Sequence, residues 1–188
     1  LQPYDENHII GFGFQTEETV RRNSLGRVTS SSAKVTGMKM ALFDVSDISN
    51  PKMISEEVIG DSKTNSTVLE NHKALLLDKE RNLLAIPIKN YTTDLSITED
   101  DDISSATKSY TSYLKSRTYN KVGYAVYSLD TANGFNLRGI ITHDVNSNDY
   151  TSDIRGLYID NTLYTVSNKE IKANNIDTLA EIKDIILD

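Results

Sequence analysis

The sequence predicts an all-β fold, and three observations carry that prediction. Alternating, β-branched and aromatic runs dominate the chain, and turn residues interrupt them about every 8 to 12 residues. Helical periodicity is confined to one polar stretch. One strand–turn–strand pattern recurs in three places, which indicates a repeated structural unit.

Composition bounds the possible functions. The chain has 188 residues, enough for one domain with a hydrophobic core, and its length does not require two. The net charge of −7 argues against a nucleic-acid partner, because neutralising phosphates needs clustered Lys and Arg. No cysteine is present, which excludes disulfides, thiolate zinc sites and cysteine nucleophiles. No apolar run is long enough for a predicted transmembrane helix.

The first half of the chain predicts strands joined by tight turns. Residues 8–14 alternate around two glycines, and residues 39–45 form a compact apolar strand. Residues 52–59 return from that strand across a turn that contains Pro51. Residues 73–77 and 83–88 follow, and their continuous apolar runs are typical of strands buried on both faces.

The second half repeats this arrangement. Residues 123–129 and 136–142 pair across a turn at 130–135. Four further strands are predicted at 154–159, 162–167, 170–176 and 180–187.

Two polar insertions, at about 15–36 and 89–120, are expected as loops. Within the second, several residues recur at helical spacing, preceded by acidic and followed by basic residues, as the helix dipole favours. These residues are Ile103, Ala106, Tyr110, Tyr113 and Leu114. A short surface helix is therefore one interpretation, and a solvated loop rich in Ser, Thr and Asp is the favoured alternative.

The repeated pattern occurs in MALFDVSDISNPKMISEEVIG, YAVYSLDTANGFNLRGIITHD and KEIKANNIDTLAEIKDIILD. Each copy follows a strand that opens at an Asn, and the unit comprises four antiparallel strands. Without insertions the unit has roughly 40 to 50 residues, which is typical of a β-propeller blade. We predict blades at about 1–60, 61–145 and 146–188, two complete and the first partial unless residues 1–4 supply its innermost strand.

A propeller has about four to eight blades, so this chain predicts a propeller fragment. The remaining blades and any export signal are expected upstream of Leu1.

Four segments resemble the secreted bacterial and archaeal proteins that contain a C-terminal β-propeller domain. They are NHIIGFGFQTEE, KMALFDVSDISNPK, NHKALLLDKERNLLAIPI and GFNLRGIITH. The resemblance covers nearly the whole chain except the two insertions. It implies an extracellular or cell-surface location, and it carries over no catalytic residues.

The three histidines are the first candidates for a functional site. His8 and His72 each follow an Asn, and His143 ends a predicted outer strand. The register places His72 and His143 at connections between blades on one rim. Histidines there could hold a metal or transfer protons, but the favoured interpretation is that they connect neighbouring blades.

Asp144, Asn146 and Asn148 are the candidate metal ligands, because they reproduce the D-x-N-x-N spacing of a calcium loop. The sequence then departs from the calcium-loop motif, because Asp149 stands at its glycine position and Arg155 at its glutamate position. Asn and Asp also favour tight turns, so a plain turn is the stronger interpretation and calcium the alternative. No other cofactor is expected.

The remaining motifs favour structural roles. No G-x-S-x-G elbow is present, and residues 11–13 lack the third glycine of a phosphate loop. The acidic run at 99–102 reads as a solvated loop, and Asp44 and Asp47 as turn-capping residues. Tyrosines near the second insertion favour packing between blades over a binding surface: Tyr91, Tyr110, Tyr113, Tyr119, Tyr124 and Tyr127.

We therefore expect a non-catalytic extracellular or cell-surface scaffold that binds a protein or a carbohydrate. The alternative is a hydrolase or lyase whose site lies at the channel of the complete propeller. The fragment leaves blade faces uncovered, so self-association of the isolated chain is also expected.

Overall fold

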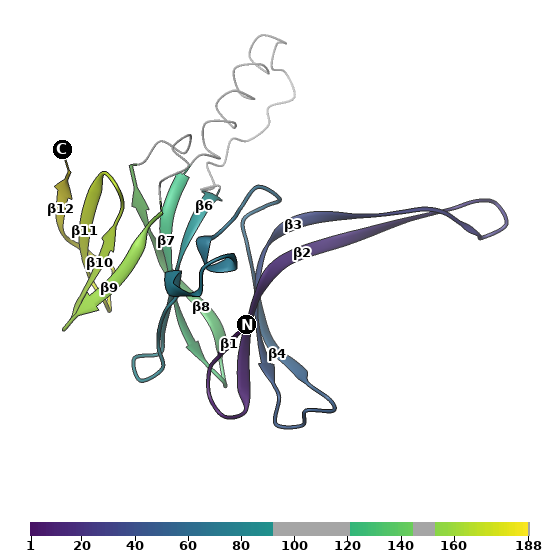
Figure 1. Cartoon of the computed structure of the whole chain (residues 1–188), viewed down its shortest axis with the longest axis horizontal. Helices are drawn as coiled ribbons and strands as arrows, with labels where there is room; N and C mark the ends of the chain where they lie inside the picture. The colour runs from purple at the N-terminus through teal and green to yellow at the C-terminus, as the bar shows by residue number, and fades with distance from the viewer. Residues whose placement is uncertain (92–120, 145–152, 188) are drawn as a thin grey trace, which may run out of the picture.

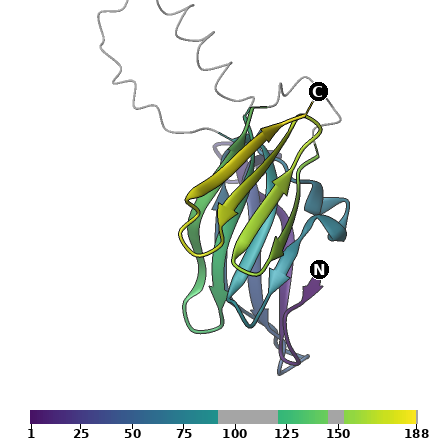
Figure 2. The same ribbon diagram turned by 90° about the vertical axis from the view of Figure 1, so that its left-hand side faces the viewer.

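The computed structural model contains three four-stranded antiparallel sheets that stand side by side (Figure 1). It describes residues 1–91, 121–144 and 153–187. Within each sheet, the strands are neighbours in the order in which they follow one another along the chain. Seen from the side, the sheets lie face to face as successive layers (Figure 2). The predicted all-β class and the repeated four-stranded unit are confirmed.

The first sheet has a very short innermost strand. Its strands are β1 (Gln2–Pro3), β2 (His8–Arg22), β3 (Val28–Asp44) and β4 (Lys52–Ile59). Gln2 pairs with Ile10 and Pro3 with Ile9, so residues at the start of the chain do supply the fourth strand. The first sheet is therefore complete in strand number, although β1 contributes only two paired residues.

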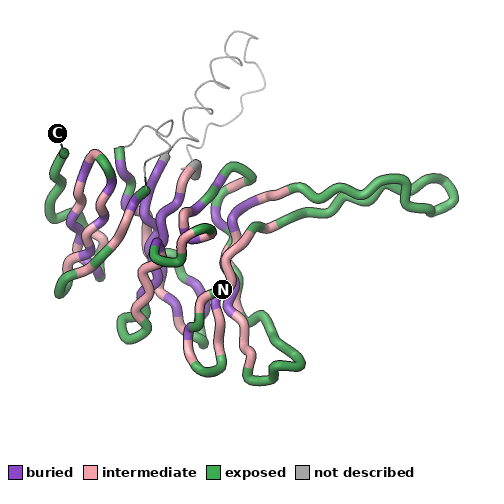
Figure 3. Tube along the Cα trace, in the orientation of Figure 1, coloured by how far each residue is buried: buried purple, intermediate pink, exposed green. Residues whose placement is uncertain are grey.

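β2 and β3 continue far beyond the rest of the first sheet. Their pairing runs from His8 opposite Asp44 to Arg22 opposite Val28, whereas the pairing of β3 with β4 ends at Met38. Residues 15–36, which we call the arm, thus form a two-stranded ribbon that projects into solvent (Figures 1 and 3). The expectation of a loop here is wrong, because Thr and Val recur along both segments and favour extended backbone despite the high polarity.

The second sheet lies in the middle. It comprises β5 (Leu76–Asp78), β6 (Leu83–Tyr91), β7 (Lys121–Asp130) and β8 (Gly134–His143). Part of the strand predicted at 73–77 is instead the 3-10 helix η2 (His72–Ala74), because the Asn71 side chain accepts a hydrogen bond from the Lys73 backbone and caps a helical turn. The helix considered within the second insertion lies outside the described residues.

The second 3-10 helix, η1 (Thr67–Leu69), precedes η2 and packs near β6. In the part of the chain that the structure describes, no helix has the length and apolar character that crossing a bilayer requires.

The third sheet ends the chain. It comprises β9 (Arg155–Ile159), β10 (Thr162–Val166), β11 (Glu170–Asn175) and β12 (Glu181–Ile186). β12 lies at the edge of this sheet, and all of its residues are exposed. The third sheet therefore ends in an open outer strand.

Two apolar layers hold the three sheets together, and β6 contributes to both. Leu84, Ile86 and Ile88 pack toward the first sheet, in a cluster with Ile10 and Leu42. The intervening Leu83 and Ala85 pack toward the third sheet, in a cluster with Leu163 and Ile176. The continuous apolar run at 83–88 is therefore buried on both faces, as predicted from the sequence.

Polar contacts add to the packing between the first and second sheets. The Tyr4 hydroxyl donates to the Leu129 carbonyl at 3.1 Å. The Lys79 ammonium group lies 3.2 Å from an Asp5 carboxylate oxygen, and the Phe135 backbone N–H donates to Ser55 Oγ at 3.3 Å. These contacts join turns of the two sheets at one end of the strands.

The Asp-rich turn between β3 and β4 is capped by its own carboxylates. Asp44 accepts from the Ser46 backbone at 2.8 Å, and Asp47 accepts from the Ser49 backbone at 3.0 Å. Hydrogen bonds from Ser46 lower the pKa of Asp44. Asp130 makes the same kind of contact with Ala132 in the β7–β8 turn. The predicted turn-capping role of Asp44 and Asp47 is confirmed.

Replacing Gly156 should test the packing between the second and third sheets. A Cβ atom at Gly156 would lie 2.4 Å from the ring of Tyr124, which is fully buried. We expect Gly156→Ala to lower the free energy of unfolding by about 1–3 kcal/mol, since the ring has no space to move. Urea denaturation measures the difference.

Gly13→Ala is the matched control, because a Cβ at Gly13 meets no atom within 4 Å. Its effect should stay within about 0.5 kcal/mol. Equal effects of the two substitutions would contradict the proposed close contact at Gly156.

Candidate functional site

Buried polar residues concentrate at the boundary between the second and third sheets. Of the seven buried polar or charged residues in the described part of the chain, five lie there. They are His143, Thr165, Ser167, Glu170 and Asn174. Because a buried polar group is costly unless it has partners, this boundary is where specific contacts are concentrated.

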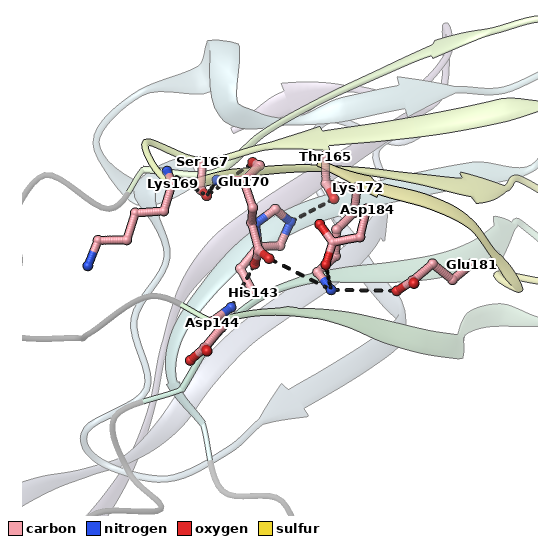
Figure 4. A network of polar contacts seen from close by, with 9 residues as sticks. All are labelled: His143, Asp144, Thr165, Ser167, Lys169, Glu170, Lys172, Glu181 and Asp184. Atoms are coloured by element: carbon pink, nitrogen blue, oxygen red, sulfur yellow. Dashed lines mark hydrogen bonds and ion pairs between the residues drawn. The ribbon is translucent and has the colours of Figure 1, made fainter. Parts of the chain in front are cut away.

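His143 connects the two sheets. It ends β8 with only 2% of its surface exposed, and its Nε2 lies 2.7 Å from Thr165 Oγ1 on β10 (Figure 4). Its Nδ1 lies 3.2 Å from Glu170 Oε1 but makes no hydrogen bond within the described part of the chain. The interpretation that His143 links neighbouring blades is confirmed by the bond to Thr165.

Glu170 is a buried carboxylate at the start of β11. Ser167 positions it, because Ser167 Oγ accepts the Glu170 backbone N–H at 3.1 Å. Its Oε1 accepts the Asp144 backbone N–H at 2.6 Å, which ties the end of β8 to β11 (Figure 4). Its Oε2 lies 3.8 Å from the Lys172 ammonium group. These partners compensate the burial of its charge.

Lys172 is surrounded by three carboxylates. Its Nζ lies 3.2 Å from Asp184 and 3.5 Å from Glu181, both on β12, in addition to Glu170 (Figure 4). Burial opposes the charge of Lys172, but the Asp184 hydrogen bond and the nearby carboxylates outweigh burial and raise its pKa. Lys172 is therefore held as a cation within the network.

The environment of His143 keeps its imidazole neutral. Burial lowers its pKa to about 4, and the positive charge of Lys172 acts in the same direction, while Asp184 opposes both. The described contacts of this network therefore fasten the second and third sheets together.

A crevice of about 390 Å³ lies beside the network, between β8 and the β11–β12 hairpin. Its lining includes Arg138, Ile140, Lys172, Asn174, Leu179 and Glu181. Its volume falls within the range of about 300–1,000 Å³ that small-molecule sites occupy. The crevice combines charged, amide and aliphatic groups on one surface.

Asn174 is a buried amide beside the crevice. It is only 4% exposed, and its Nδ2 donates to the Leu179 carbonyl at 2.9 Å, but its buried Oδ1 accepts no hydrogen bond from the described residues. Leu179 itself has a left-handed φ of 59°, and the absence of a side chain at Gly139 leaves room for its Cδ1. The hairpin thus holds Asn174 and Leu179 side by side at the crevice.

Arg138 fixes the end of the crevice. Its guanidinium group donates to the Asp177 carbonyl at 2.8 Å and to the Ile176 carbonyl. These bonds join β8 to the β11–β12 hairpin, because Ile176 and Asp177 belong to its turn. The position of the hairpin relative to β8 is therefore set by Arg138 at one end and Glu170 at the other.

The predicted calcium loop is only partly described. Asp144 is seen through its backbone bond to Glu170, while Asn146 and Asn148 lie outside the described residues. Within residues 1–91, 121–144 and 153–187, no three His, Asp or Glu side chains form a group that could hold a metal ion. The calcium hypothesis at Asp144, Asn146 and Asn148 stays a prediction.

The three histidines occupy separate places. His8 Nδ1 lies 2.7 Å from Asp5 Oδ1 within the β1–β2 hairpin, and His72 is exposed in η2. Although burial alone would raise it, the pKa of Asp5 is lowered to about 2 by hydrogen bonds from Asn7, His8 and Lys79. The histidines therefore form no common site.

Two of the candidate tyrosines pack between sheets. Tyr124 and Tyr127 are fully or almost fully buried in the two apolar layers, and burial raises the pKa of both. This confirms the packing interpretation for these two. Tyr110, Tyr113 and Tyr119 lie outside the described residues, and the side chain of Tyr91 is not described.

Sequence reasoning missed most of the network at this boundary. A signal was present along β11, where Glu170, Lys172 and Asn174 alternate with Ile171 and Ala173. Alternate residues of a strand share one face, so this spacing gives β11 a polar face. That face meets β8 across the boundary.

The His143 environment predicts a pH-dependent stability. The unfolded chain protonates this imidazole below about pH 6.5, whereas the folded chain resists protonation until about pH 4. The stabilising contribution is therefore complete above pH 6.5 and is lost as the pH falls to 4, by up to about 3 kcal/mol. Urea denaturation across this range measures it.

His143→Gln should lose this pH dependence, and His72→Gln, at an exposed position, should retain it. A wild-type free energy of unfolding that stays constant between pH 6.5 and 4 would contradict a neutral, buried His143.

The comparison with known families agrees with this architecture. The family model described as a β-propeller domain matches residues 1–179. No curated protein and no solved structure matches the chain significantly. Tandem four-stranded antiparallel sheets stacked face to face are the blades of a propeller. The chain therefore belongs to the β-propeller domain family.

Proposed function

We propose that this chain is a non-catalytic binding module of a β-propeller, located outside the cell or on its surface. The crevice between β8 and the β11–β12 hairpin is the proposed site, and a carbohydrate is the proposed ligand. The observation that carries the proposal is the crevice itself, where the charged Lys172 and Glu181 lie beside the aliphatic Ile140 and Leu179. The location rests on the sequence resemblance alone.

The crevice offers the contacts that a sugar needs. Sugar hydroxyls can donate to the Glu181 carboxylate, and they can accept from Lys172 Nζ. Ile140 and Leu179 provide aliphatic surface for the C–H groups of the ring.

The charged groups at the crevice support binding without catalysis. Glycoside hydrolysis requires two carboxyl groups across the scissile bond, one of them protonated. Glu181, Glu170 and Asp184 all lie within ion-pair distance of Lys172, so all three engage one structural cation. Lys172 is in turn held protonated by them.

The uncovered faces at both ends of the stack are proposed to pack against further blades of the ring. The first sheet exposes Ile54 and Val58 on β4, and the third exposes Leu157 and Ile159 on β9. Apolar side chains grouped on a sheet face favour burial against another layer.

Two carboxylates that contact the same lysine provide a matched test. Glu181 and Asp184 both pair with Lys172 from β12, but only Glu181 lines the crevice. We expect Glu181→Ala to weaken carbohydrate binding about tenfold, as loss of a hydrogen bond to a charged group implies. Asp184→Ala should leave the affinity within about twofold.

The probe is a panel of soluble neutral trisaccharides, with binding followed by titration calorimetry and by amide chemical shifts of β8, β11 and β12. Failure of every trisaccharide to shift these amides would reject the carbohydrate ligand. If Glu181→Ala and Asp184→Ala lose carbohydrate affinity equally, the binding site does not lie in the crevice.

A further inference from the structure

The arm has a basic tip on an acidic protein. Residues 19–33 contain Arg21, Arg22 and Arg27 and no acidic residue, so they carry +3. Because the whole chain carries −7, the remainder carries −10. In the described part of the chain, no carboxylate pairs with the three guanidinium groups. The tip therefore presents uncompensated positive charge.

The geometry of the tip is fixed by its own hydrogen bonds. Asn23 Oδ1 accepts from the Leu25 and Arg27 backbone N–H groups, both at 3.0 Å. The Arg22 guanidinium group donates to the Gly26 carbonyl at 3.1 Å. The turn is closed by Gly26 at a φ of 74°, a conformation that glycine adopts without strain. The arginines are thus carried on a defined hairpin end.

The arm is more exposed than a two-stranded ribbon can easily sustain. Residues 16–34 are all exposed, including Val20, Leu25 and Val28. An isolated two-stranded hairpin is marginally stable in water, because it buries little apolar surface. A partner that covers the arm would remove this weakness.

An acidic surface lies at the other end of the strands. The turns that follow β1, β3, β5, β7, β9 and β11 gather at one end of the three sheets, away from the strand ends where the arm begins (Figure 1). We call these turns the turn rim; its segments are 4–8, 44–52, 78–83, 130–134, 159–162 and 175–180. They contain nine carboxylates and three cationic side chains, Lys52, Lys79 and Arg81. The exposed carboxylates include Glu6, Asp47, Glu80, Asp160 and Asp177.

We propose that the arm of one copy of this chain places its arginine tip on the turn rim of a second copy. The argument is charge complementarity, since the rim carries −6 and the tip +3 within one sequence. The arm leaves the strand ends that lie away from the rim and runs sideways, past the first sheet (Figure 1), so the contact joins two different surfaces and is head-to-tail. Each pair retains one free arm and one free rim, and further copies can add.

This association has a salt dependence that identifies it. Exposed charges interact over about 10 Å at 0.1 M salt and about 3 Å at 1 M. Arm-to-rim association therefore weakens as salt rises. Association through the uncovered apolar sheet faces would instead persist or strengthen with salt, so the two modes are distinguishable.

Sedimentation equilibrium of the whole chain tests the proposal. At about 0.02 M salt we expect an average mass above the 21.0 kDa of one chain, returning to 21.0 kDa at about 0.5 M. Arg21→Glu with Arg22→Glu should give 21.0 kDa at both concentrations. Lys73→Glu with Lys183→Glu, exposed and equal in charge change, should associate like the wild type.

A mixture of two variants gives the decisive result and guards against misfolded variants. Replacing Glu6, Glu80, Asp160 and Asp177 by Lys changes the rim from −6 to +2, so this variant should also be monomeric alone, because its rim repels the wild-type tip. Mixing this variant with Arg21→Glu/Arg22→Glu should restore association, since the unaltered +3 tip of the first then meets the unaltered −6 rim of the second.

A monomeric wild type at low salt, association that survives high salt, or a mixture that stays monomeric would each overturn the proposal. A monomeric wild type whose arm binds polyglutamate would assign the tip to a foreign acidic partner instead.

Discussion

The burial of β6 on both faces is the constraint on which the rest of the fold depends. Since neighbouring residues of a strand point to opposite sides, the run Leu83–Ile88 supplies apolar side chains to both interfaces. The first and third sheets each pack one apolar face against the middle sheet. A polar residue anywhere in this run would weaken one of the two interfaces.

The two interfaces differ in the kind of contact that aligns them. Between the first and second sheets, large apolar side chains dominate, with polar contacts at the turns. Between the second and third, buried polar groups fix the alignment, because Glu170 reaches the Asp144 backbone and Arg138 reaches the Asp177 carbonyl. Such bonds form in one relative placement of the sheets, and this placement creates the crevice.

The fold could be predicted because its signals are local. Alternation, turn residues and the three-copy pattern all lie within short stretches of sequence. The arm was mistaken for a loop because its Ser and Thr content resembles a solvated segment, although Thr also favours strands. The start of β5 was misplaced because the cap at Asn71 outweighs the apolar run after it.

The site was less predictable, because its partners come from different sheets. His143 was recognised as a link, but its partner Thr165 belongs to a strand whose placement follows from packing. Asn174 reads in the sequence as a turn residue near the end of a strand, and nothing local shows that its Oδ1 is left without a partner. Asp144 was proposed for its side chain, yet the described contact uses its backbone.

The open outer edge at β12 also bears on solubility. An exposed strand edge can recruit strands from other chains and start aggregation. Here Glu181, Lys183 and Asp184 place charges along β12, and at the β1 edge of the first sheet Pro3 has no N–H to offer a new strand. These two edges therefore discourage indiscriminate strand addition, so that sheets can meet through their faces without fusing along their edges.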